Sequence, residues 1–237
     1  MSLKQEKYGK ECKRRIGERM ALIKKDITGM FNRELPNASK YTNQPTQSQI
    51  RQYKQNKKGI VDPIVISSLK KHPEDILHGS QSLHMILPNM REPNDWDLYS
   101  PKEESRALSL EKSLDEKMKS DFFYTQKGKL PAPPSKEPKT ASRAFNATKL
   151  YEIKVRGITD PQIEVMDVPK GLPTFPFKGI THESLESQHY KLDFRASTNI
   201  AKMSNAIGDR NAIEEYLESH GKPVPERTHG LTQRKKR

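Results

Sequence analysis

Residues 78–100 read HGSQSLHMILPNMREPNDWDLYS, and this stretch decides the expected fold. The Gly79-Ser80 turn leads into an apolar helical segment that should end near Pro88-Asn89. Residues 95–99 then alternate polar with apolar side chains and include two aromatic residues, which predicts a strand. A turn, a helix and a strand in this order are typical of a domain that combines a sheet with helices.

Two carboxylates lie on the predicted strand. Asp95 and Asp97 are two positions apart, so their side chains should project from one face, about 7 Å apart along the backbone. Such a pair can hold Mg²⁺ or Mn²⁺, because Mg²⁺ prefers hard oxygen ligands and is usually completed by substrate phosphates. Gly79 lets the backbone approach an anion, and the helix that begins at Ser80 presents free N–H groups to it. The stretch therefore predicts a site for a divalent metal ion and a triphosphate.

A third carboxylate on an adjacent antiparallel strand would let such a site hold two ions and align an attacking hydroxyl with the α-phosphate. Asp167 and Glu164 are the candidates, on a strand predicted for residues 162–168. They are three positions apart, so their side chains face opposite sides of a regular strand and only one of them can serve. The strand pattern by itself leaves that choice open.

The rest of the chain supplies further helices and strands. A helix is predicted from Asp62-Pro63 to His72-Pro73, and another after a Ser100–Glu103 capping box with Pro101 at its first position. The remaining expectations are strands at 75–78, 121–124 and 149–155, a hairpin turn at 157–161, irregular structure at 169–176, and helices after Thr181 with a break at Gly208. This order predicts the α/β (α+β) class, with a small mixed sheet flanked by helices mostly on one side.

Composition divides the 237 residues into three parts. Only 32% of the residues are hydrophobic and 31% are charged, so not all of the chain can be packed into a core. We expect a basic N-terminal helix (residues 3–31) and flexible linker in residues 1–58, a folded domain in 59–220 and a basic disordered tail in 221–237. A proline-rich loop at 127–143 should be mobile in front of the site.

The charge balance indicates a polyanionic partner. The formal net charge is +13, and residues 1–58 hold 15 Lys and Arg against 5 Asp and Glu. This favours nucleic acid, contacted through the basic N-terminal arm. One cysteine, Cys12, excludes an intramolecular disulfide, and no stretch has the roughly 18 apolar residues of a membrane span. We therefore expect a soluble, intracellular protein without a membrane partner.

The motif set resembles a known family. The His-Gly-Ser turn, the helix and the Asp-Trp-Asp-Leu-Tyr-Ser strand are similar to the polymerase-β-type nucleotidyltransferase superfamily, and most similar to its small single-domain members in large DNA viruses. The resemblance covers roughly residues 74–217, although the gap from Ser80 to Asp95 is slightly longer than usual. It continues through Leu87-Pro88, Asp121-Phe122-Phe123, Val165-Met166-Asp167-Val168-Pro169, Gly179-Ile180 and Ser184-Leu185-Glu186.

The resemblance implies an activity and assigns residues to it. It implies transfer of a nucleoside monophosphate from a nucleoside triphosphate to an acceptor hydroxyl, with Asp95, Asp97 and Asp167 binding the metal ions. It therefore favours Asp167 over Glu164. It also implies nucleotide binding by Gly79, Ser80, Arg195, Lys202, Asp209 and Arg210. If the chain is viral, it would act in the cytoplasm or nucleus of an infected cell or in the virion. The alternative is a non-catalytic nucleic-acid-binding or virion protein that reuses the fold.

Overall fold

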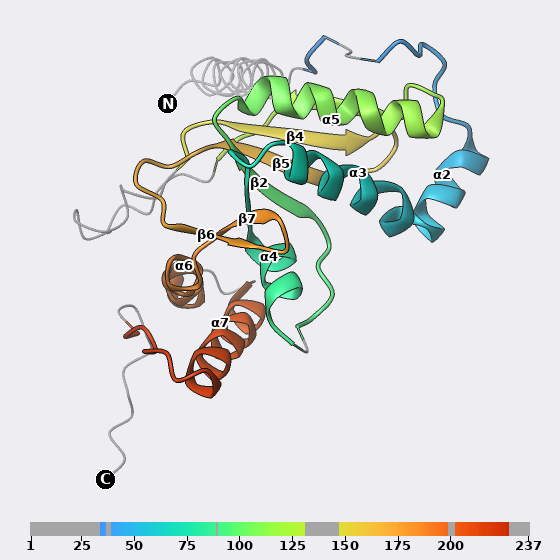
Figure 1. The fold of residues 1–237 in the computed structure, drawn as a ribbon. Helices are drawn as coiled ribbons and strands as arrows, with labels where there is room; N and C mark the ends of the chain where they lie inside the picture. Colours follow the sequence, from blue (N-terminus) through green and yellow to red (C-terminus); the bar gives the residue numbers. More distant parts are fainter. Residues whose placement is uncertain (1–33, 37–38, 89, 131–146, 199–201, 228–237) are drawn as a thin grey trace, which may run out of the picture.

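The computed structural model describes residues 34–36, 39–88, 90–130, 147–198 and 202–227 (Figure 1). The predicted helix at 3–31, most of the loop at 127–143 and the basic run at 233–237 lie outside the described residues.

A seven-stranded mixed sheet forms the centre of the described chain, in the order β3-β4-β5-β2-β1-β7-β6. The pairs β1–β2, β3–β4, β4–β5 and β6–β7 are antiparallel, while β2–β5 and β1–β7 are parallel. The strands are β1 Ile76–His78, β2 Trp96–Ser100, β3 Phe123–Lys127, β4 Leu150–Val155, β5 Pro161–Asp167, β6 Thr174–Phe177 and β7 Ile180–Glu183.

Six helices among the described residues flank this sheet: α2 Gln47–Gln55, α3 Lys57–Lys71, α4 Gly79–Ile86, α5 Glu103–Met118, α6 Leu185–Thr198 and α7 Met203–Ser219. Figure 1 shows α3 and α5 together at the β4–β5 end of the molecule, and α6 and α7 near β6 at the other end. The predicted α/β class with a mixed sheet and flanking helices is confirmed. None of the helices in the described part of the chain is long and apolar enough to cross a bilayer.

Alternate residues of the central strands face two different environments. Leu98 and Val165 belong to the main core, which also holds Leu110 and Leu114 of α5. Their neighbours Tyr99 and Met166 belong to a separate, smaller cluster with Ile76 and Leu150. Because the side-chain period of a strand is two, the residues before and after Leu98 share the face of Tyr99 and point away from the main core.

The segment 36–58, predicted as a linker, contains a helix. Thr46 and Gln49 form a capping box at the start of α2, and the buried Tyr53 donates a hydrogen bond from its hydroxyl to Gln162 Oε1 at 2.9 Å. A cap, the buried Tyr53 and the partly buried Ile50, which packs against the main core, stabilise this otherwise polar helix. Helix α3 then begins at Lys57, so Pro63 lies inside it and not at its first turn.

Other element boundaries also differ from the expectations. Ser100 ends β2, and α5 begins only at Glu103 without a side-chain cap. Residues 174–177 and 180–183, expected to be irregular and helical, form the antiparallel pair β6–β7. Pro176 fits there because β6 is the last strand of the sheet, where a missing N–H donor is tolerated. Gly208 lies within α7 and does not interrupt it.

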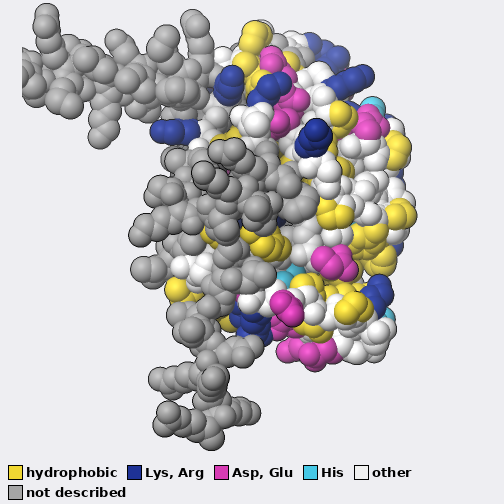
Figure 2. All heavy atoms as spheres, turned by 90° about the vertical axis from the view of Figure 1, so that its left-hand side faces the viewer, with side chains coloured by type: hydrophobic (Ala, Val, Ile, Leu, Met, Phe, Trp, Pro, Cys, Tyr) yellow, Lys and Arg dark blue, Asp and Glu magenta, His cyan; other side chains and the backbone are white. Residues whose placement is uncertain are grey.

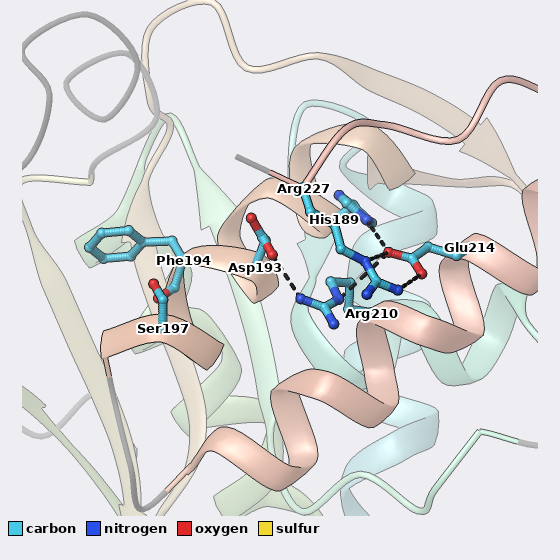
Figure 3. A network of polar contacts seen from close by, with 7 residues as sticks. All are labelled: His189, Asp193, Phe194, Ser197, Arg210, Glu214 and Arg227. Atoms are coloured by element: carbon cyan, nitrogen blue, oxygen red, sulfur yellow. Dashed lines mark hydrogen bonds and ion pairs between the residues drawn. The ribbon is translucent and has the colours of Figure 1, made fainter. Parts of the chain in front are cut away.

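An ion-pair network fixes α7 against α6 (Figure 3). Glu214 of α7 accepts hydrogen bonds from Arg227 at 2.9 and 2.5 Å and lies 2.9 Å from His189 Nε2 of α6. Arg210 lies beside it and donates to Asp193 Oδ1 of α6 at 2.7 Å. Burial opposes ionisation of Glu214, but its hydrogen bonds to Arg227 and His189 outweigh burial and lower its pKa to about 2.

This shift predicts an acid-sensitive contribution to stability. Because the folded pKa of Glu214 is depressed below its usual 4.5, its carboxylate should stabilise the fold fully above pH 4.5 and lose this effect as the pH falls to about 2. We expect Glu214→Gln to lower the free energy of unfolding by on the order of 1–2 kcal/mol at neutral pH, after allowance for solvent screening. The difference from wild type should vanish towards pH 2.

Urea denaturation between pH 3 and 7 would measure this difference. Glu215→Gln, at the exposed neighbouring position of α7, is the matched control and should follow the wild-type profile. A constant offset between Glu214→Gln and wild type across the whole range would contradict the assignment.

Candidate active site

A row of polar side chains crosses the central strands on the face away from the main core. Asp97 of β2 is paired with His78 of β1 on one side and with Glu164 of β5 on the other. Glu164 is in turn paired with Glu152 of β4. Paired residues of adjacent strands lie about 5 Å apart and point to the same face, so three carboxylates from three strands stand side by side.

Gly79 brings the start of α4 directly against Asp97. Its φ is +69°, in the left-handed region that glycine adopts without a steric penalty. A Cβ atom at this position would lie 2.2 Å from Asp97 Oδ2, so no residue with a side chain fits there without a shift. The turn and the carboxylate predicted as phosphate and metal groups are therefore in contact, and Ser80 follows in the first turn of α4.

The acids oppose one another's ionisation. Burial, and then the negative charges of Asp95 and Glu164, raise the pKa of Asp97 to about 8, although Arg195 and Lys202 counteract this. Burial and the charges of Asp95 and Glu152 likewise raise the pKa of Glu164. Both residues keep partial exposure to solvent. Asp95, Asp97 and Glu164 thus form one electrostatically coupled group, whose repulsion a bound cation would relieve.

Asp167 lies apart from this group. It is paired with Ser100, at the opposite end of β2 from Asp95, and it follows Ile163 and Val165 on the face of the main core. Burial opposes its ionisation, but hydrogen bonds from the Thr148 side chain and the backbone N–H groups of Thr148 and Lys149 lower its pKa. Its oxygens therefore cap the chain entering β4, and the geometry favours Glu164, the other candidate, over Asp167.

The orientation of β5 explains the difference. A third acid was expected on an antiparallel neighbour of the strand that carries Asp95 and Asp97, whereas β5 runs parallel to β2. The parallel register sets Glu164 level with Asp97 and leaves Asp167 three residues farther along. The alternation of the strand then turns Asp167 to the other face. The sequence contained Glu164 as a candidate, and the register places it beside Asp97.

Three basic residues act on the acids from the C-terminal helices and the loop before β2. Arg195 of α6 and Lys202, just before α7, both attract the charge of Asp97, and Lys202 also attracts that of Glu164. The negative charges of Asp95 and Asp97 attract the guanidinium of Arg91, which also donates two 2.9 Å hydrogen bonds to Asp209 of α7. Sequence reasoning named Arg195, Lys202 and Asp209 but missed Arg91, whose only signal was its nearness in sequence to the acids.

Arg210 has a different position from the other predicted nucleotide-binding residues. It is buried between α6 and α7, donates to Asp193 and lies 3.6 Å from Glu214 through its Nε atom (Figure 3). Its guanidinium is therefore engaged within the protein, and its evident role is to join the two helices that carry Arg195 and Lys202.

A second polar group lies beside the acids on the same face of the sheet. The His78 ring stacks on Tyr99 with centroids 3.9 Å apart, and the Tyr99 hydroxyl accepts a 2.9 Å hydrogen bond from Lys191 Nζ of α6. Lys191 also forms a 2.6 Å ion pair with the fully buried Glu183. Burial, with the charges of Lys191 and Arg195, holds the pKa of His78 well below its usual value, so this ring stays neutral.

The remaining features limit what the arrangement can do unaided. Among the described residues, no three His, Cys, Asp or Glu side chains form a group that could hold a metal ion.

On the part of the surface visible in Figure 2, dark blue basic and magenta acidic side chains are interspersed. The net positive charge of the chain is thus not gathered into one basic patch on the described residues of that face.

Comparisons with known proteins give similarity of fold only. No family model matches the chain, and no curated protein matches it. Among solved structures, the Megavirus polyadenylate synthase is similar with a TM-score of 0.47 and 12% identity, over 76% of this chain and 39% of that one. JHP933 from Helicobacter pylori has a TM-score of 0.37 and 11% identity, over 74% of this chain and 69% of that one.

A third structure, from H. pylori and named as a candidate nucleotidyltransferase, has a TM-score of 0.29 and 10% identity, over 74% of this chain and 81% of that one. With 39% of the Megavirus protein covered, the chain spans well under half of that protein's length. At these scores and identities the three structures carry no conclusion about the activity, substrate or partner of this chain.

Proposed function

We propose that the chain is a metal-dependent nucleotidyltransferase, which transfers a nucleoside monophosphate from a nucleoside triphosphate to an acceptor hydroxyl and releases pyrophosphate. The observation that carries this proposal is the contact between Gly79, at the start of α4, and Asp97, beside Glu164 on the next strand. A helix start that can receive phosphates and a set of carboxylates that can receive Mg²⁺ or Mn²⁺ thereby meet at one point.

The donor set fits a divalent cation. Asp95, Asp97 and Glu164 offer carboxylate oxygens, the ligands that Mg²⁺ and Mn²⁺ prefer, and their mutual repulsion would be relieved by positive charge. The lack of a ready three-ligand group in the described residues is compatible with this ion, since Mg²⁺ is usually bound by one or two carboxylates together with substrate phosphates. When bound, the metal would neutralise phosphate charge and lower the pKa of the attacking hydroxyl.

The chain's own groups would then orient the substrates. The backbone N–H groups at the start of α4 and the Ser80 hydroxyl would bind the outer phosphates. Arg195 and Lys202 would balance charge on the same triphosphate, and the paired Asp209 would orient Arg91 towards it. Glu164 takes the place of Asp167 as the third acid beside the acceptor hydroxyl. Arg210 would act on the nucleotide only indirectly, by holding α6 and α7 together.

A non-catalytic nucleic-acid-binding protein is the second candidate. It is favoured by the formal net charge of +13, which supports contact with a polyanion such as nucleic acid. Such a protein would bind nucleic acid in a salt-dependent way, and its binding would survive the loss of all the acids. If the chain is viral, as the resemblance of its motifs suggests, such a protein would act in the infected cell or in the virion.

Incubation with α-labelled nucleoside triphosphates, Mg²⁺ or Mn²⁺ and RNA, DNA or protein acceptors tests the proposal. We expect transfer that Asp97→Asn and Glu164→Gln each reduce by at least about 10²-fold, because loss of a metal ligand removes several kcal/mol of transition-state stabilisation. Asp167→Asn, also an acid-to-amide change on β5, is the matched control and should keep activity within a few-fold of wild type.

The outcomes separate the candidates. Full transfer activity in Glu164→Gln together with loss of activity in Asp167→Asn would show that Asp167, and not Glu164, is the third acid. No transfer by the wild-type chain to any acceptor, or transfer unaffected by Asp97→Asn, would leave the binding protein as the function.

The contact at Gly79 gives a second test. Gly79→Ala should weaken Mn²⁺ and nucleotide binding and destabilise the fold, since the methyl group meets Asp97 at 2.2 Å and the φ of +69° is strained for alanine. Gly171→Ala is the matched control, because its φ is +72° and nothing lies within 4 Å of the added Cβ. Gly171→Ala should lower the free energy of unfolding by only about 1 kcal/mol, because its one unfavourable effect is the left-handed backbone conformation of an alanine.

Urea denaturation and Mn²⁺ titration by electron paramagnetic resonance would measure both variants. Equal effects of the two substitutions on stability and on Mn²⁺ affinity would show that the approach of Gly79 to Asp97 has no part in ion binding.

A further inference from the structure

A cavity of about 460 Å³ opens beside Asp95. Its walls come from the α2–α3 junction at residues 54–58, from Gln81 and His84 of α4, and from residues 92–96 before and at the start of β2. A volume of this size is typical of a site for one small ligand of nucleotide dimensions. Apart from Asp95, no residue that lines this cavity has a functional role described above.

The walls combine cations with hydrogen-bonding groups. Lys54, Lys57 and Lys58 supply three ammonium groups, while the acids of the cavity are already engaged. Asp62 accepts a 2.9 Å hydrogen bond from Trp96 Nε1, and Glu92 is paired with Lys58. Asp95 would be neutralised by a bound cation. With ions on the acids of the active site, the cavity would therefore carry net positive charge.

Polar side chains on the α4 side remain available for a ligand. Gln81 and His84 line the cavity, and the Nδ1 atom of His84 is buried with no hydrogen-bond partner among the described residues. A buried polar atom without a partner costs free energy, which a ligand donor or acceptor could recover. Amide and imidazole groups of this kind can bond to the edge of a nucleobase.

Cations approach the acids from two sides. Arg195 and Lys202 belong to the α6–α7 side and act on Asp97. Lys57 belongs to the α2–α3 side, where Asp95 attracts its charge and its Nζ atom donates to the Asn94 carbonyl. In-line transfer places the attacking and leaving oxygens on opposite sides of the reacting phosphate, so the acceptor and the triphosphate approach the metal ligands from different sides. The first side faces the proposed triphosphate, which leaves the second for the acceptor.

We propose that this cavity binds the 3′-terminal nucleotide of a polynucleotide acceptor, with lysines at its mouth contacting the backbone phosphates and Gln81 and His84 facing the base. This inference rests on the proposed function for the position of the acceptor hydroxyl near Asp95. A polynucleotide fits better than a protein acceptor, because the lining joins three ammonium groups to base-bonding amides in a space for one nucleotide.

The test compares two double variants on one helical region. Lys54→Ala/Lys58→Ala removes two charges at the cavity, and Lys70→Ala/Lys71→Ala removes two exposed charges at the far end of α3. Both are made in the full chain carrying Asp97→Asn, so that no transfer consumes the ligand. Binding of labelled 12-nucleotide RNA and DNA is measured by fluorescence anisotropy with Mg²⁺ at two salt concentrations, and binding of a fluorescent nucleoside triphosphate is measured alongside.

We expect the cavity variant to weaken oligonucleotide binding about 5–20-fold and to reduce the salt slope by about 1–2, while the affinity for the triphosphate stays unchanged. The α3-end variant should change oligonucleotide affinity less than about twofold. An oligonucleotide with 4-thiouridine at its 3′ end should crosslink to residues 54–58 or 81–96, and one with the label at its 5′ end should not.

Three results would overturn the inference: equal weakening by both double variants, loss of triphosphate binding with oligonucleotide binding intact, or crosslinks that do not depend on the labelled end. Failure of the proposed function gives a different pattern. If the wild-type chain transfers nothing but the oligonucleotide still binds and crosslinks at the cavity through its 3′ end, the cavity assignment stands and the catalytic proposal falls.

Discussion

The parallel pairing of β2 with β5 is the constraint on which the candidate site depends. It aligns Asp97 with Glu164 and Leu98 with Val165, so the same register that closes the main core also sets two carboxylates side by side on the opposite face. A slip of one residue would exchange the two faces and place acids in the core. The hydrophobic residues of these strands therefore fix the position of the polar ones.

This arrangement places like charges close together in a partly buried position. Burial, and then the charges of Asp95 and Glu164, raise the pKa of Asp97 to about 8, so this carboxyl holds its proton at neutral pH when no cation is present. Such a group contributes little to stability by itself, and perturbed carboxyls of this kind are concentrated at functional sites. The neighbouring polar contacts are, by contrast, well satisfied: Asp167 accepts three hydrogen bonds, and Arg91 pairs with Asp209 through two.

Local patterns predicted the parts of the site that are close in sequence. The Gly79-Ser80 turn, the helix after it and the strand carrying Asp95 and Asp97 all appear near their expected places. Which of Glu164 and Asp167 lies beside Asp97 could not be predicted in this way, because it depends on the direction and register of a strand more than sixty residues away. Composition misled in a similar way at α2, where one buried tyrosine and a capping box outweigh a polar sequence. Likewise, Pro63 was expected in the first turn of a helix. Residues Lys57 to Asp62 are already helical, so Pro63 lies inside α3.

The two ends of the sheet serve the site in different ways. At one end, α3 and α5 cover the main core and bring the α2–α3 junction beside Asp95. At the other end, α6 and α7 are joined through the buried pair of Arg210 with Asp193 and through Glu214, so Arg195 and Lys202 are carried on a supported unit. Lys57 on the first side and Arg195 and Lys202 on the second interact with the acids from different elements. Under the proposed function, a change in the packing of α6 on α7 should therefore alter triphosphate binding before it alters acceptor binding, and a change at the α2–α3 junction should do the reverse.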